Sequence, residues 1–142
     1  MPTLAKHILR VSATTRHLSE VRDFVARHAR KFGFTDSDVE DIRLAVDEAY
    51  TNVVKHAYHN DTSQVVQIEL GGNDYEFWVS LIDNGDSFDP KSYHEPNIQQ
   101  SVHNGKRGGV GVYLIRQLMD MVEYRKNDGQ NEIRMRKTLR KD

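Results

Sequence analysis

Apolar residues in the first third of the chain recur every three or four positions, which is the repeat of a helix with one buried face. Two such segments are separated by Gly33, and a glycine there is typical of a helix C-terminus. Thr14 or Thr15 is a suitable N-cap for the first segment, and Thr35 or Asp36 for the second. The predicted buried stripes are Leu18, Val21, Val25, Ala29 and Phe32 in the first helix, and Val39, Ile42, Val46, Ala49 and Val53 in the second.

Other segments alternate between apolar and polar residues, which is the repeat of a strand. Two of them flank Gly71-Gly72-Asn73-Asp74, and these residues tolerate the backbone angles of a hairpin turn. Asn127-Asp128-Gly129 predicts a second hairpin turn near the end of the chain. The predicted strands are residues 7–12, 64–70, 76–82, 122–125 and 131–139.

Between the two hairpins lie an irregular segment and one more helix. Residues 83–108 contain Gly, Asp, Ser, Asn and two prolines without any repeat, and long segments of this kind are usually functional. Helical spacing then returns with two alternative apolar faces. One consists of Val110, Leu114, Leu118 and Met121, and the other includes Ile115 and Val122.

This order of elements predicts an α+β two-layer sandwich, with the helices on one face of a mainly antiparallel sheet. The tight turns imply antiparallel neighbours, and the long connections suggest some mixed pairing. A length of 142 residues fits one domain that spans residues 1–142.

Charge and composition argue against several classes of function. The chain has 20 Lys and Arg against 21 Asp and Glu, and a net charge of −1 does not suit a nucleic-acid or anionic-membrane surface. The lack of cysteine excludes disulfides, thiol catalysis and Cys-ligated zinc. No segment has the length and hydropathy of a signal peptide or a membrane span, so we expect a soluble cytoplasmic protein. A basic run near the C-terminus is interpreted as a solvated strand edge followed by a tail: Arg134, Arg136, Lys137, Arg140 and Lys141.

Glu48, Asn52 and His56 are spaced four residues apart, so they share one face of the second helix beside its apolar stripe. Such a face can be a solvated polar flank. It can also serve phosphate chemistry, because Asn52 offers a neutral oxygen to Mg²⁺, which takes waters and substrate phosphates as further ligands. Glu48 can accept a proton from an attacking hydroxyl or water. We assign His56 no catalytic role, and the seven histidines contain no convincing zinc pair.

Asp83-Asn84-Gly85 directly follows an apolar strand. The segment can be an ordinary turn that ends the strand, because Asp-x-Gly is common at such places. Alternatively, the Asp83 carboxylate can accept a hydrogen bond from the exocyclic amine of adenine, and Gly85 can let the backbone approach the base.

Four glycines lie within seven residues at the predicted start of the last helix, from Gly105 to Gly111. They can form a flexible hinge. Free amides at the positive end of a helix also suit a phosphate, and Lys106 and Arg107 add positive charge. The segment is not a Walker A loop, because no Gly-Lys-Ser/Thr follows, and no strand precedes it as in a Rossmann fingerprint.

In order and spacing, these segments resemble the nucleotide-binding boxes of GHKL ATP-binding domains, which have the Bergerat or histidine-kinase-like ATPase fold. The run E-x-x-x-N-x-x-x-H-A-Y begins at Glu48, D-x-G-x-x-F at Asp83, and G-G-x-G-x-x-L at Gly108. The resemblance extends from about Leu9 to about Thr138. Among the branches of the family, the chain looks most like the small stand-alone serine/threonine kinases that act as anti-sigma factors. The segments that carry this likeness are DIRLAVDEA at 41–49, TN at 51–52, HAY at 56–58, DSFDP at 86–90, and 108–120.

The resemblance implies a role for each matching residue. Glu48 would be the general base and Asn52 the Mg²⁺ ligand. Asp83 would recognise adenine, with Gly85 allowing close approach, and residues from about 87 to 108 would form the ATP lid. Gly109 and Gly111 would touch the phosphates, and the other expected ATP-binding residues of this segment are Lys106, Arg107, Gly108 and Val110.

The family also implies partners. ATP and Mg²⁺ would be the cofactors, and the substrate would be a Ser or Thr hydroxyl on an anti-anti-sigma protein of the STAS fold. A sigma factor and a second copy of the chain are further expected partners, whereas nucleic acid and membrane are not.

Other functions are open to the same fold. A sensor histidine kinase core would need a phosphoacceptor helical hairpin, and a topoisomerase, Hsp90 or MutL relative a transducer domain; 142 residues leave no room for either. The alternative from a different class is a non-catalytic ATP-binding regulatory module that sequesters a partner protein. Glu48 favours the kinase, because a pure binder needs no base.

Overall fold

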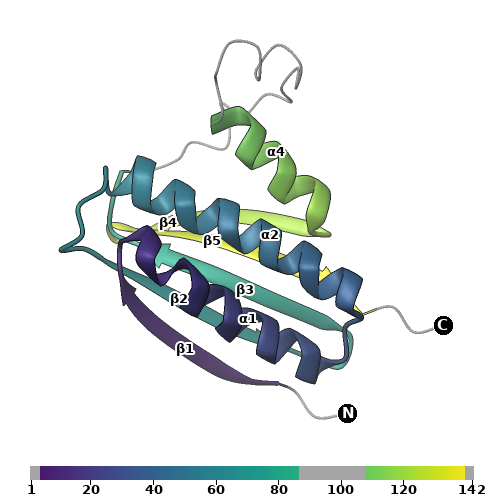
Figure 1. The fold of residues 1–142 in the computed structure, drawn as a ribbon. Coiled ribbons are helices and arrows are strands. Elements are labelled where there is room, and N and C mark those ends of the chain that lie inside the picture. Colours follow the sequence, from purple (N-terminus) through teal and green to yellow (C-terminus); the bar gives the residue numbers. More distant parts are fainter. Residues whose placement is uncertain (1–3, 87–107, 140–142) are drawn as a thin grey trace.

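The fold is given by a computed structural model. It describes residues 4–86 and 108–139, and the side chains of 5–86 and 113–139. The predicted order of strands and helices is confirmed (Figure 1). The elements are β1 (Leu4–Ser12), the 3₁₀ turn η1 (Thr15–His17), α1 (Leu18–Phe32), α2 (Asp36–Asn52), the π-helical turn η2 (Val53–Ala57), β2 (Val65–Gly72), β3 (Glu76–Asp83), α4 (Gly108–Leu118), β4 (Met121–Asn127) and β5 (Gln130–Thr138).

The five strands form one sheet in the order β1-β2-β3-β5-β4, and all four neighbouring pairs are antiparallel. The expectation of mixed pairing is therefore wrong for the described strands. Between β1 and β2 the chain runs back along α1 and forward along α2, so β2 starts where β1 ended and runs antiparallel to it (Figure 1). β5 folds back from β4 and lies between β4 and β3, which separates two strands that run in the same direction.

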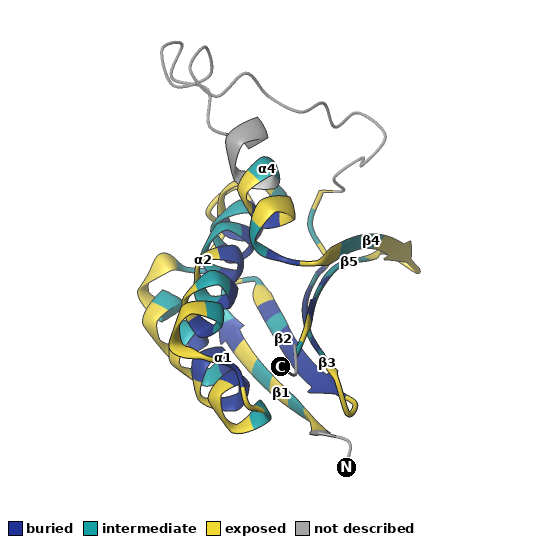
Figure 2. Cartoon of the chain, turned by 90° about the vertical axis from the view of Figure 1, so that its right-hand side faces the viewer, coloured by how far each residue is buried: buried dark blue, intermediate teal, exposed yellow. Residues whose placement is uncertain are grey.

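The α-helices of the described residues, α1, α2 and α4, cover the same face of the sheet, and the core lies between the two layers (Figure 2). This arrangement confirms the predicted α+β two-layer architecture. Every residue of the two predicted helical stripes is buried in this core or packed against it. Strand side chains alternate between the two faces, so every second residue of β2 and β3 enters the core. These are Val66, Ile68 and Leu70 in β2, and Phe77, Val79 and Leu81 in β3.

The helix ends lie close to the predicted positions. The hydroxyl of Thr35 accepts a hydrogen bond from the amide of Asp38 at 3.2 Å and so caps α2. Gly33 ends α1 with a φ of 120°. Thr14 caps η1, and α1 starts after that turn. At its other end α2 continues into the π-helical turn Val53–Ala57, a geometry that is frequent at functional sites.

Gly71 and Gly72 belong to β2, so the prediction that they form the hairpin turn is wrong. A Cβ on Gly71 would lie 2.7 Å from Cζ2 of Trp78, and a Cβ on Gly72 would lie 2.6 Å from the carbonyl oxygen of Glu76. Both positions therefore need glycine because a neighbour approaches closely. The turn itself is stabilised by Asn73, whose side-chain oxygen accepts a hydrogen bond from the amide of Glu76 at 2.9 Å.

The sheet face opposite the helices carries stacked and paired side chains. The guanidinium of Arg134 lies over the ring of Trp78, 3.9 Å from its centroid, and its Nε donates to the hydroxyl of Ser80 at 2.8 Å. Arg136 forms ion pairs with Glu123 at 2.6 Å and with Glu76 at 2.9 Å. These contacts join three adjacent strands, β3, β5 and β4.

The interpretation of the basic run as a solvated strand edge is wrong for its described residues. β5 lies inside the sheet, between β3 and β4. Lys137 is 9% exposed and faces the helices, where its Nζ donates to the carbonyl oxygen of Leu118 at 2.8 Å. Since the end of α4 carries unpaired carbonyl groups, a buried ammonium there is well placed.

Of the two possible apolar faces of α4, the buried one is the face that includes Ile115, which is 1% exposed. Leu114 and Met121 of the other face are 38% and 53% exposed. In the described part of the chain, no helix is both long and apolar enough to cross a membrane.

Candidate active site

Asp47 of α2 pairs with Arg22 of α1 at 2.7 Å, so by helical geometry the flank with Glu48 and Asn52 lies on the other side of α2, away from α1. Ala45 and Ala49 on that side are almost fully buried, and α4 packs beside α2. By helical geometry, Glu48 and Asn52 follow the same side slightly further from the core, and both are half-buried. The spacing read from the sequence therefore places both side chains at the border between the two helices.

Asp83 is the last residue of β3 and is only 5% exposed. Its Oδ1 accepts two hydrogen bonds of 2.9 Å, from the backbone amide of Gly85 and from Nδ2 of Asn131. Burial raises the pKa of Asp83, and the two hydrogen bonds oppose this shift because they favour the carboxylate. No hydrogen bond among the described residues uses Oδ2. One carboxylate oxygen is thus held by the protein, and the other is available to a ligand.

Gly85 packs directly against the π-helical turn at the end of α2. A Cβ on Gly85 would lie 2.3 Å from the carbonyl oxygen of Ala57, and the amide of Asp86 donates to the same oxygen at 2.9 Å. The close approach that requires glycine is therefore an approach to protein backbone. The predicted approach of the Gly85 backbone to the adenine base stays a prediction.

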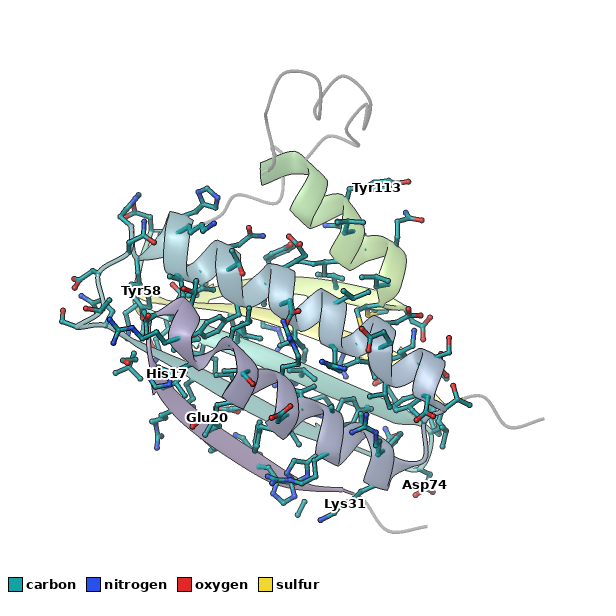
Figure 3. The ribbon with its side chains drawn as sticks, viewed as in Figure 1. His17, Glu20, Lys31, Tyr58, Asp74 and Tyr113 are labelled. Atoms are coloured by element: carbon teal, nitrogen blue, oxygen red, sulfur yellow. The ribbon has the colours of Figure 1, made fainter. Side chains whose placement is uncertain are left out.

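Tyr58 ties the same loop to the sheet at the end where α2 stops and β2 begins (Figure 3). Its hydroxyl donates to the carbonyl of Val65 at 2.7 Å and accepts from the amide of Asn84 at 2.8 Å. The next residue, His59, contacts the Asp86 carboxylate at 2.6 Å, and both side chains are exposed. The loop after β3 is held by these contacts against the end of α2.

The glycine-rich segment opens a helix, as the sequence predicted, because α4 begins at Gly108. The N-terminus of α4 presents backbone amides and the positive end of the helix dipole. α4 runs antiparallel to α2, so this end lies beside the C-terminal half of α2, which carries Glu48 and Asn52 (Figure 1). The first turn contains Gly108, Gly109, Val110 and Gly111. Lys106, Arg107 and all but the last residue of the lid expected at about 87–108 lie outside the described residues.

Sequence reasoning missed two residues of this site, Asn131 and Tyr58. Asn131 is 48 residues from Asp83, and only the register of β3 against β5 places the two directly opposite each other. The turn at Asp128 and Gly129, with φ of 52° and 80°, fixes the start of β5. Counting strand positions from this turn would have put Asn131 on the helix-covered face. No signal in the sequence pointed to the two hydrogen bonds of the Tyr58 hydroxyl.

The residues fit a nucleotide–metal complex better than a free metal ion. Within residues 4–86 and 108–139, no group of three or more His, Asp or Glu side chains could hold a metal. The carboxamide oxygen of Asn52 suits Mg²⁺ only if phosphates and water complete its shell. The buried acceptor at Asp83 and the amides at the start of α4 suit the two ends of such a nucleotide.

The chain is similar to known proteins over nearly its whole length. Residues 11–137 match the histidine kinase-like ATPase domain family. The serine-protein kinase RsbW of Halalkalibacterium halodurans is 35% identical over 136 residues, which are 93% of this chain and 82% of that protein. The RsbW kinase of Bacillus velezensis is 32% identical over 125 residues, which are 85% of this chain and 78% of that protein. Among solved structures, the RsbU and RsbW domains of a Mycobacterium tuberculosis protein have the same fold. This match has a TM-score of 0.68 and 18% identity, and it covers 96% of this chain and 33% of that one.

Proposed function

Because the chain belongs to the histidine kinase-like ATPase domain family and is a serine-protein kinase of the RsbW type, we propose that it acts as a cytoplasmic anti-sigma factor. Its substrate is a Ser or Thr hydroxyl of a STAS-type anti-anti-sigma protein, which receives the γ-phosphate of ATP. A sigma factor is the second partner, and the active form is a homodimer.

Each site residue has one task in this reaction. Asp83 accepts a hydrogen bond from the adenine amine, and the first turn of α4 binds phosphate oxygens through its amides. Asn52 is the protein ligand of Mg²⁺, which supplies positive charge to the phosphates when bound. Glu48 accepts the proton of the attacking hydroxyl. Phosphoryl transfer depends mainly on positioning and charge, so one base and one metal ligand suffice.

One observation supports this assignment most directly. Asp83, buried at the end of β3, uses one carboxylate oxygen for the protein and keeps the other available. It lies at the same end of the molecule as the C-terminus of α2 and the start of α4 (Figure 1). The proposed base-recognition group and the proposed phosphate-binding helix end therefore lie at one end of the molecule, beside the half of α2 that carries Glu48 and Asn52 (Figure 1).

The competing function is a regulatory module that holds ATP and sequesters a partner without transferring phosphate. Glu48→Gln distinguishes the two, because it keeps the shape of the side chain and removes its basicity. We expect phosphorylation of the cognate STAS protein to fall by about 10²–10⁴ while ATP affinity stays nearly unchanged. Asn52→Ala should lose both activity and Mg²⁺-dependent ATP affinity.

The assay is transfer of radiolabelled phosphate from ATP to STAS-type proteins from the same cell, with calorimetry of ATP binding in parallel. Glu40→Gln is the matched control, since Glu40 is exposed on the same helix, and it should leave both measurements unchanged. Tight ATP binding without transfer by the wild type, together with unaltered regulation by Glu48→Gln, would establish the module and refute the kinase.

A further inference from the structure

Asn131 and Asp83 form a cross-strand pair on the helix-covered face of the sheet. They lie directly opposite each other in the β3–β5 ladder, and Asn131 is half-buried. The Nδ2 group of Asn131 donates to Oδ1 of Asp83 and to the carbonyl oxygen of Gly85, each at 2.9 Å. One amide group therefore clamps both the carboxylate and the backbone of the loop that follows it.

The clamp fixes the direction of the carboxylate. With the Gly85 amide as a second donor, both protein hydrogen bonds converge on Oδ1 of Asp83. A carboxylate with one oxygen held by two donors can rotate little, so Oδ2 keeps one position. Asn131 itself has no donor left for a base, because its one donor group, Nδ2, makes both of these hydrogen bonds to protein atoms.

We infer that Asn131 is a specificity-determining residue of the nucleotide site, which holds Asp83 as a fixed, ionised acceptor and so selects purines with an amine at C6 over purines with a carbonyl there. This inference rests on the proposed function, in which Asp83 recognises the base. Asn131 acts through Asp83 and is a positioning residue.

The chemistry behind the selection is a donor–acceptor match. Adenine presents an amine donor at C6, whereas hypoxanthine presents a carbonyl acceptor. An ionised Asp83 pairs only with the first, and a protonated Asp83 could donate to the second. Burial raises the pKa of Asp83, and the donors from Asn131 and Gly85 counteract that effect. Loss of the Asn131 donor would therefore favour the protonated form that prefers the wrong base.

Few other charged groups bear on Asp83. The Tyr58 hydroxyl approaches from the end of α2, and Lys126 lies opposite Asn131 in β4 with an exposed side chain. His59 and Asp86 form their exposed pair in the adjoining loop. None of these groups donates a hydrogen bond to the Asp83 carboxylate among the described residues, so the Asn131 donor is the side chain to test.

The test compares ATP with inosine triphosphate, which differs in carrying a carbonyl at C6. Affinities of the wild type, Asn131→Ala and Asn131→Asp are measured by calorimetry with Mg²⁺ between pH 5.5 and 8.5. Gln130→Ala, at an exposed neighbouring position on β5, is the control and should match the wild type. Asn131→Asp keeps the side-chain size, so it still tests the inference if the alanine variant folds poorly.

We expect the wild type to prefer ATP at every pH. In Asn131→Ala the preference should fall about tenfold at the acid end and recover at the alkaline end, and the acid limb of ATP affinity should move to higher pH. Asn131→Asp should show a larger displacement, because it adds a like charge beside Asp83.

Two results would count against the reasoning in different ways. An ATP preference and pH profile in both Asn131 variants that equal the wild type would overturn the inference and leave the proposed function intact. Equal wild-type affinities for ATP and inosine triphosphate, with no effect of Asp83→Asn, would instead remove Asp83 from base recognition and overturn the assignment beneath it.

Discussion

Replacing Gly85 with alanine tests the close packing of the loop after β3 on the end of α2. The new Cβ would lie 2.3 Å from the carbonyl oxygen of Ala57, whereas ordinary contacts begin at 3.4 Å. The loop must therefore move by about 1 Å from a rigid backbone neighbour. It cannot do so and keep the Asp86 amide at 2.9 Å from the same oxygen. Overpacking of this kind typically costs about 1–3 kcal/mol of unfolding free energy.

The same movement should weaken nucleotide binding. The Gly85 amide is one of the two donors to Oδ1 of Asp83, and a hydrogen bond to a charged group contributes about 1.5–3 kcal/mol. We therefore expect Gly85→Ala to bind ATP at least about tenfold more weakly. Urea unfolding measures the first effect, and calorimetry with ATP and Mg²⁺ measures the second.

Gly33→Ala is the matched control for Gly85→Ala. Its φ of 120° is strained for alanine, but the nearest atom to a new Cβ is a Leu139 methyl carbon at 3.5 Å, and the position is at the end of α1. This variant should lose stability without losing ATP affinity. If Gly85→Ala unfolds at the wild-type urea concentration and binds ATP equally well, the close packing on Ala57 is not present in solution.

Two further predictions concern titratable groups. Asp83→Asn should weaken ATP binding by about 1–3 kcal/mol in calorimetry, because an amide replaces a pure acceptor; equal affinity, with the exposed Asp128→Asn as control, would place Asp83 outside the site. Burial lowers the pKa of His28, whose ring lies 4.1 Å from that of His7 and whose Nδ1 has no hydrogen-bond partner among the residues that the structure describes. The unfolded chain therefore binds this proton more readily than the folded chain does. The contribution of His28 to the free energy of unfolding is full above about pH 6.5, the ordinary pKa of histidine, and it is lost as the pH falls through the lowered pKa of the folded state. Urea unfolding at pH 7.5 and 5.5 should show this loss, and His28→Leu should reduce it; equal pH dependence in both proteins would contradict the assignment.

The sequence predicted well those features that depend on local periodicity. The two helical stripes, the cap at Thr35 and the glycine stop at Gly33 all follow from residues within one or two turns of each other. The one-turn spacing of Glu48 and Asn52 likewise follows from helix geometry alone. Local rules fixed these elements because their hydrogen bonds and burial patterns repeat along the chain.

Features that depend on contacts between distant segments could not be read in this way. Gly71 looked like a turn residue, but its place in β2 is set by the ring of Trp78 on the next strand. Arg134 was predicted to lie on a solvated strand edge, but its strand, β5, lies inside the sheet. The hydrogen bond between Asp83 and Asn131 depends on strand register, and a shift of one residue would turn every side chain to the other face.

Trp78 is the chain's one tryptophan, and its position determines what intrinsic fluorescence can report. Its indole lies on the sheet face away from the helices, between Gly71 and the guanidinium of Arg134. Emission at the tryptophan wavelength will therefore follow unfolding, or a partner that covers this face, and we expect it to change little when nucleotide binds at the proposed site beside α2. A titration with ATP monitored by this signal would show little change even at full occupancy, so binding is better followed by heat or by a labelled nucleotide. This insensitivity to nucleotide is useful when ATP and a partner protein are both present. A change in emission on adding a tryptophan-free partner protein would then identify contact at the sheet without interference from ATP.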